Sequence, residues 1–121
     1  MGREAKTNAV KDMSYQFAIR TVRLYQHLSS EKKEFVLSKQ LLRSGTSVGA
    51  NVHEAPGGVS KKDFANKMAI AYKEALENKY WLSLLHDTYY LNDIQYKSIY
   101  ADADSLCSIL YSIINTTRNN T

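Results

Sequence analysis

Apolar residues recur at intervals of three, four and seven along almost the whole chain, and this is the spacing of one face of an α-helix. One proline and five glycines are the only strong helix breakers, and the clearest interruption is Pro56-Gly57-Gly58. No segment shows sustained alternation of apolar and polar residues, so a β-sheet is not expected. The pattern therefore restricts the chain to an all-α fold with long helices and short loops.

The spacing predicts four helices, at about residues 8–29, 31–55, 61–91 and 93–116. Ser30 is the expected cap of the second helix, and Pro56 blocks its continuation because proline lacks an amide proton. Ser60 and Asp63 form a capping box at the start of the third. Long helices joined by short loops pack most simply as an antiparallel up-down-up-down four-helix bundle. We expect one such domain over residues 1–121.

Positive charge is concentrated in the first two thirds of the chain. Residues 1–79 hold 14 of the 16 basic groups and 8 of the 12 acidic ones, a balance of +6, whereas residues 80–121 balance to −2. A basic region can attract RNA, DNA or another anionic partner, but Lys and Arg also simply solvate helix surfaces. The candidate phosphate-binding residues are Arg20, Arg23, Lys32, Lys33, Lys39, Arg43, Lys61 and Lys62.

Nothing in the composition points to a membrane or to an oxidising compartment. No apolar run approaches the roughly 20 residues that a membrane-spanning helix requires. Cys107 is the one cysteine, so it has no disulfide partner within the chain, and it lies in an apolar stripe. We expect a buried thiol in a cytoplasmic protein without membrane contact.

Two features suggest close packing and self-association. Residues 44–51 contain mostly small side chains, with Gly45 and Gly49 four apart. Because glycine costs about 1 kcal/mol relative to alanine inside a helix, this pair predicts the close approach of another helix backbone. The chain also has nine tyrosines and one tryptophan, several of them off the main apolar stripes. Such rings suit subunit interfaces, or they wrap the protein's own core.

An enzyme is not expected. A carboxylate-bridged di-metal site in a four-helix bundle needs Glu-x-x-His on two helices. The residues three positions before His27, His53 and His86 are Leu24, Ala50 and Ser83, so the motif is absent. No Cys/His cluster has the spacing of a zinc site, and no nucleophile elbow occurs. We therefore expect no catalytic residues, no metal and no cofactor.

A row of polar residues follows one side of the second predicted helix and faces a charged row on the third. The two rows consist of Arg43, Ser47, Asn51 and Glu54 on the second helix, and Lys73, Glu74 and Glu77 on the third. They are interpreted as a network that sets the register between helices or subunits. The alternative is a contact with a polar ligand or RNA.

The segment Leu41-Leu42-Arg43-Ser44-Gly45-Thr46-Ser47-Val48-Gly49-Ala50-Asn51-Val52, followed by Glu54-Ala55, resembles the signature of the 23S (large-subunit) ribosomal RNA intervening-sequence proteins. Ala71-Tyr72-Lys73-Glu74-Ala75 and Tyr80-Trp81-Leu82 are also similar to that family. The resemblance implies a four-helix bundle that assembles into a homopentamer, with no established activity. It extends to the accessory variability determinant of diversity-generating retroelements, basic pentamers thought to bind nucleic acid and a reverse transcriptase.

Two functional hypotheses follow. The first is a non-enzymatic homo-oligomer that binds nucleic acid, RNA above all, through phosphate contacts with little discrimination between bases. The second is a scaffold or accessory subunit that binds a partner protein and has no nucleic-acid binding of its own.

Overall fold

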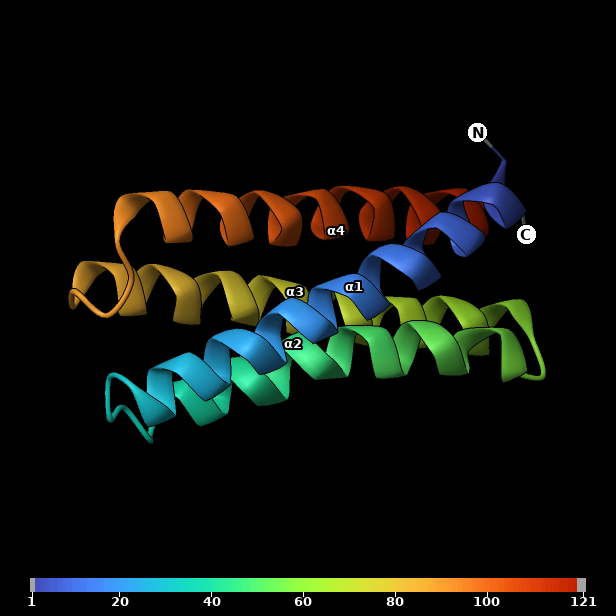
Figure 1. Ribbon diagram of the computed structural model, residues 1–121. Helices are drawn as coiled ribbons and strands as arrows, with labels where there is room; N and C mark the ends of the chain where they lie inside the picture. Colours follow the sequence, from blue (N-terminus) through green and yellow to red (C-terminus); the bar gives the residue numbers. More distant parts are fainter. Residues whose placement is uncertain (1, 120–121) are drawn as a thin grey trace.

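The computed structural model describes residues 2–119, which form four α-helices and one short 3-10 helix. The elements are α1 (Arg3–Ser30), α2 (Leu37–Glu54), η1 (Ala55–Gly57), α3 (Lys61–Asp87) and α4 (Asp93–Asn119). Each α-helix packs against the next, and α1 also packs against α4 (Figure 1). Within residues 2–119, no Cα atom of α1 lies within 8 Å of one in α3, and the same holds for α2 and α4, so the diagonal helices are not neighbours. The predicted all-α antiparallel up-down-up-down bundle is confirmed.

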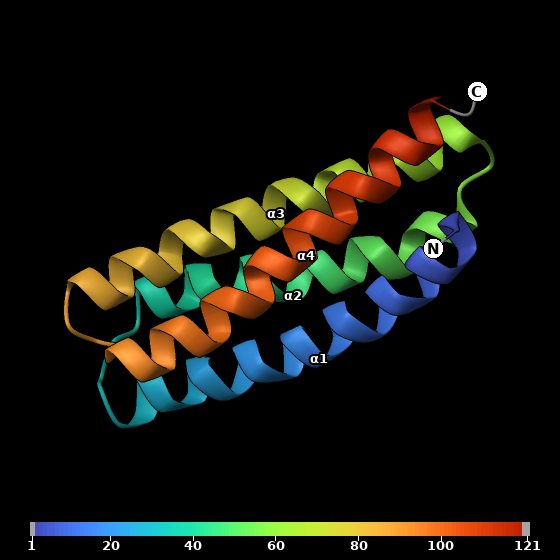
Figure 2. The ribbon, with the colours of Figure 1, turned by 90° about the horizontal axis from the view of Figure 1, so that it is seen from above.

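This topology gives the bundle two different ends (Figure 2). The α1–α2 and α3–α4 connections lie together at one end, which we call the loop end. The start of α1, the end of α4 and the α2–α3 connection lie at the opposite end, which we call the terminal end. Residues that are far apart in sequence are therefore brought together at each end.

The core is built from the inward faces of all four helices. The largest fully buried side chains include Phe17 and Leu28 of α1, Leu41 of α2, Met68, Leu82 and Leu85 of α3, and Leu106, Leu110 and Ile113 of α4. Burying one such side chain contributes about 1.5–3 kcal/mol. Cys107 is also in this core, and its burial raises the pKa of the thiol. The predicted burial of Cys107 is confirmed.

Two of the small residues of α2, Gly45 and Gly49, lie directly against α1. A Cβ atom added to Gly45 would lie 2.5 Å from Cγ2 and Oγ1 of Thr21 in α1. One added to Gly49 would lie 3.3 Å from the carbonyl oxygen of Ser14. Gly45 and Gly49 are both buried, so the close helix approach that their spacing predicts is present between α1 and α2.

The predicted start of the second helix at residue 31 is wrong. α1 continues through Ser30, and α2 begins only at Leu37. The Ser30 hydroxyl donates to the Gln26 carbonyl of its own helix instead of capping α2. The capping group is the buried carboxylate of Glu34. Its Oε1 accepts from the amides of Val36 and Leu37 at 3.1 and 2.9 Å, and its Oε2 accepts from the amide of Ser38 at 2.6 Å.

Three other predicted boundaries differ from the structure by more than one residue. α1 begins at Arg3, not residue 8, α3 ends at Asp87, not residue 91, and α4 ends at Asn119, not residue 116. The α3 end has the hydrogen-bond pattern of a Schellman motif, with Tyr89 N–H bound to His86 O and Tyr90 N–H bound to Leu85 O. Tyr89 has φ 70°, a left-handed conformation that glycine usually occupies at this position. Because Tyr89 is not glycine, the sequence contained no signal for this stop.

Replacing Tyr89 by glycine is expected to stabilise the protein by about 0.5–1 kcal/mol. The left-handed conformation costs a non-glycine residue about 1–2 kcal/mol. Glycine removes this cost, but it also raises the conformational entropy of the unfolded chain, which offsets part of the gain in stability. Little packing is lost, because Tyr89 is 92% exposed. Urea denaturation measures the change. Tyr89→Ala, which keeps Cβ, is the matched control and should show no gain; equal stability of the two variants would contradict the assignment of strain.

Candidate nucleic-acid interface

Within the predicted polar network, Arg43 of α2 forms ion pairs with two glutamates of α3. Arg43 Nη1 lies 2.9 Å from Glu74 Oε2, and Arg43 Nη2 forms an ion pair with Glu77 Oε2. The same Glu77 oxygen accepts from Trp81 Nε1 at 3.1 Å. The structure thus joins three of the seven residues of the predicted network, and it adds Trp81. Because these ion pairs are partly exposed, each contributes about 1 kcal/mol or less to stability.

The other four residues of the predicted network do not join this cluster. Ser47 Oγ donates to the Arg43 carbonyl, and Asn51 Nδ2 donates to the Ser47 carbonyl, so both bonds stay within α2. Glu54 Oε1 lies 3.1 Å from Lys67 Nζ in a separate α2–α3 ion pair. Lys73 is exposed and forms no ion pair within residues 2–119.

The buried side-chain amide of Asn78 also links α3 to α2. Asn78 Nδ2 donates to Leu41 O at 3.2 Å and to Ser44 Oγ at 3.1 Å. Its Oδ1 is buried without a hydrogen-bond partner among the described residues. Because burying a polar group is costly unless it is bonded, the two donor contacts specify where α3 sits on α2.

Arg20, one of the predicted phosphate-binding residues, connects α1 to α4. Its guanidinium donates to Asp102 Oδ2 at 2.5 Å and to Ser98 Oγ at 2.9 Å. Both residues are on α4, so the Arg20 side chain links the first helix of the bundle to the last. A phosphate would have to compete with the carboxylate of Asp102 for it.

The eight predicted phosphate-binding residues do not form one surface. Lys32, Lys33 and Lys39 lie at the loop end, and Lys61 and Lys62 lie at the terminal end. Arg20, Arg23 and Arg43 lie between the ends along α1 and α2. Since α-helices rise 1.5 Å per residue, helices of this length separate the two ends by roughly 35–40 Å. The charge-based prediction therefore names cations on different parts of the surface.

Several of these cations are nevertheless exposed and unpaired. Within residues 2–119, no ion pair involves Arg23, Lys32, Lys33, Lys39 or Lys62, all of which are exposed. By contrast, eight of the chain's 12 acidic residues bind partners inside it: Glu34, Glu54, Glu74, Glu77, Asp87, Asp93, Asp102 and Asp104. Among the exposed charged groups that form no ion pair within residues 2–119, cations therefore outnumber carboxylates.

A cluster of polar and aromatic side chains between α3 and α4 has no signal in the sequence pattern. His86 Nε2 lies 2.6 Å from Asp93 Oδ1, and Nδ1 lies 3.0 Å from Asp87 Oδ1. The imidazole stacks on the Tyr96 ring, with centroids 4.4 Å apart. Asp93 and then Asp87 raise the pKa of His86, because each carboxylate favours the protonated ring. Only the fold brings Asp93 and Tyr96 of α4 to His86 of α3.

The same face continues toward the middle of the bundle. Lys79 Nζ lies 2.7 Å from Asp104 Oδ1 on α4 and 5.1 Å from the centroid of the Tyr100 ring. The hydrogen bond to Asp104 raises the pKa of Lys79. These contacts fasten α3 to α4 and assign Lys79 to the structure of the bundle.

Within residues 2–119, no group of three or more His, Cys, Asp and Glu side chains is arranged to hold a metal ion. None of the helices in that range is long and apolar enough to cross a membrane. The fold and surface define a class of protein: a four-helix bundle with charged networks between its helices and exposed cations along its surface.

The comparisons identify the family within this class. Residues 6–112 match the model of the 23S rRNA-intervening sequence protein family, and the chain belongs to that family. A solved structure from Bacteroides thetaiotaomicron, described as a protein of unknown function from the S23 ribosomal protein family, is 54% identical. It has a TM-score of 0.90, and the match covers 91% of this chain and 98% of that one. No curated protein matches.

Proposed function

We propose that this protein is a non-enzymatic homo-oligomer, a pentamer, that binds RNA through phosphate contacts. The observation that carries the proposal is that, among the exposed charged groups that form no ion pair within residues 2–119, cations outnumber carboxylates. Lysine and arginine side chains that neutralise phosphates release condensed counterions, and this release drives binding irrespective of base sequence. The family description refers to 23S rRNA, which supports RNA as the first ligand to test.

Self-association is supported by the outward face of α3. Ile70, Leu76 and Tyr80 are exposed at 45%, 41% and 60%. Apolar and aromatic side chains on a helix face favour burial against another surface. A ring of identical subunits would also repeat any cationic surface, so that several weak phosphate contacts act together.

Fluorescence-anisotropy titration with a structured RNA and a DNA duplex of the same length is expected to show submicromolar affinity for RNA at low salt. The slope of log K against log salt is expected to be steep, because each neutralised phosphate contributes about 0.7–0.9 to it. Sedimentation equilibrium on the same samples gives the subunit number. A lack of binding even at low salt would reject the nucleic-acid proposal, and a monomer would reject the assembly.

A partner-protein scaffold is the second candidate, and the loop end favours it. Phe35, Val36 and Ile94 are exposed there at 53%, 72% and 82%. Apolar side chains gathered at one end of a bundle suit a protein contact. Affinity purification from nuclease-treated lysate separates the two candidates, since a protein partner survives the nuclease and a partner bridged by RNA does not.

A further inference from the structure

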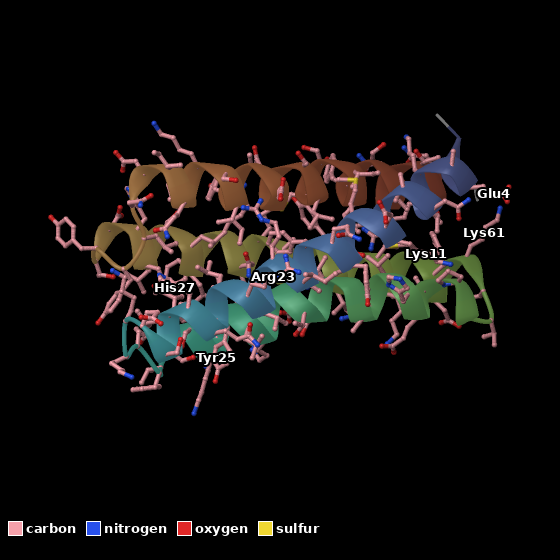
Figure 3. All side chains as sticks on the ribbon, viewed as in Figure 1. Glu4, Lys11, Arg23, Tyr25, His27 and Lys61 are labelled. Atoms are coloured by element: carbon pink, nitrogen blue, oxygen red, sulfur yellow. The ribbon has the colours of Figure 1, made fainter. Side chains whose placement is uncertain are left out.

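Two hollows at the terminal end share one lysine. The first lies between α1, the α2–α3 connection and the start of α3, and its lining includes Glu4, Lys11 and Lys61. The second lies between the start of α3 and the end of α4, and its lining includes Lys61, Lys62, Thr117 and Arg118. Lys61 therefore stands between the two hollows, which form one continuous surface across three helices. Figure 3 shows Glu4, Lys11 and Lys61 at this end, away from Arg23 and His27.

The charge of this surface is strongly positive. Lys11, Lys61, Lys62 and Arg118 line it, and Glu4 is the one carboxylate among its lining residues. Lys61, Lys62 and Arg118 are exposed, and Lys11 is half-buried. Lys61 and Arg118 also interact within the chain. Ser60 caps the start of α3 at the same place, and because the negative end of the α4 dipole also lies there, the side chains and not the helix dipoles set this charge.

A second observation is independent of charge. Thr117 lines the hollow with Lys61, Lys62 and Arg118, it is 1% exposed, and its Oγ1 has no hydrogen-bond partner among the described residues. A buried hydroxyl without a partner is unusual in a folded protein, and it marks a place where a donor or acceptor is missing. A phosphate oxygen is an acceptor that such a hydroxyl can bind once a side-chain shift exposes it, since the atom itself is buried in this structure.

The loop end has a different charge pattern. One hollow there is lined by His27, Lys32, Tyr89 and neighbouring residues, and a second is lined by His86, Asp87 and Asp93. The two aspartates repel phosphate, and the lysines of this end are not collected into one hollow. A third hollow at the terminal end, on the far side of the α2–α3 connection, contains Glu54, Asp63 and Lys67 and limits the cationic surface there.

We infer that the terminal end, through Lys11, Lys61, Lys62 and Arg118, is the surface that binds the nucleic-acid backbone. The inference rests on the proposed function and assigns its location. The inference assigns phosphate binding to one surface instead of to cations spread over the protein. It also adds Lys11 and Arg118 to the phosphate-binding residues expected from the sequence. It also predicts that Arg20 and Arg43, which hold carboxylates, serve the bundle and not the ligand.

Two triple variants with the same loss of charge test the location. Lys11→Gln/Lys61→Gln/Lys62→Gln changes the terminal end, and Lys32→Gln/Lys33→Gln/Lys39→Gln changes the loop end. Titration of the RNA and the DNA duplex is expected to show a loss of about tenfold or more for the first variant, with a salt slope smaller by about 2–3. The second variant should stay within about twofold of the unaltered protein. Circular dichroism verifies that both are folded.

A single substitution is expected to raise the affinity for RNA instead of lowering it, and a misfolded variant would not show such a gain. Glu4→Gln removes the carboxylate from the cationic surface and is expected to raise affinity about two- to threefold, with no change in fold. Equal losses in the two triple variants, or a larger loss at the loop end, would overturn the assigned location while leaving RNA binding intact. If the unaltered protein binds neither nucleic acid, the proposed function fails first.

Discussion

Gly45→Val is expected to lower the free energy of unfolding by about 3 kcal/mol, at the upper end of the cost of overpacking a core. Even the first added carbon would lie 2.5 Å from two side-chain atoms of Thr21, and it would lie 2.9 Å from Thr21 Cβ. These atoms belong to the buried crossing of α1 and α2, so relief requires the helices to separate. Chemical denaturation followed by circular dichroism measures the loss.

Gly57→Ala is the matched control for this prediction. Gly57 has no atom within 4 Å of an added Cβ, and the substitution is expected to leave stability unchanged or to raise it slightly. A double-mutant cycle adds a sharper test, because Gly45→Ala combined with Thr21→Ala removes two of the three closest atoms. The pair should be less destabilised than the sum of the single variants. Strict additivity would show that the helices already have room at Gly45.

Glu34→Ala is expected to cost about 2 kcal/mol, which is the loss of a charged helix cap with its group of hydrogen bonds. One buried carboxylate accepts the amides of Val36, Leu37 and Ser38, and α2 has no other side-chain cap. Glu34→Gln keeps the size of the side chain but removes the charge, so it should retain part of the cap. Urea denaturation of the three proteins at neutral pH gives the ranking.

The same carboxylate makes the prediction depend on pH. Burial alone would raise the pKa of Glu34, but the three amides and the Ser38 hydroxyl favour the ionised form and outweigh it, so the pKa lies below its ordinary 4.5. A lowered folded-state pKa contributes stability above the unfolded value and loses it as pH falls through the folded value. The advantage of the natural protein over Glu34→Gln should therefore be constant near neutrality and shrink below about 4.5. A pH-independent difference would contradict this account.

The fold was predictable because its information is repeated along the chain. Every helix carries several turns of apolar residues, so one misleading position does not change the assignment. The ends of the helices depend on single residues, and the boundaries predicted from the sequence were wrong at several of them. Ser30 is a good cap by type, but the carboxylate of Glu34 takes that role, and Tyr89 adopts a conformation that only the folded chain imposes.

The candidate site was predictable only in part, for a related reason. The spacing of the two polar rows correctly indicated that Arg43 faces Glu74 and Glu77, because residues three or four apart share a helix face. It could not indicate that Ser47 and Asn51 bond within their own helix. Lys11, Lys61 and Arg118 are distant in sequence, and only the antiparallel order of four helices brings them to one end.

Because Trp81 Nε1 donates a hydrogen bond to Glu77, the fluorescence of this tryptophan is sensitive to changes in the surroundings of Glu77. Trp81 is the one tryptophan of the chain, and its indole is linked to the α2–α3 charge network. It lies 20 residues after Lys61 on α3, or roughly 30 Å along the helix. If α3 meets another subunit, as proposed, the emission of Trp81 should therefore change, and it should stay unchanged if a ligand occupies the distant end. Intrinsic fluorescence, without any attached dye, separates assembly from ligand binding in a single titration.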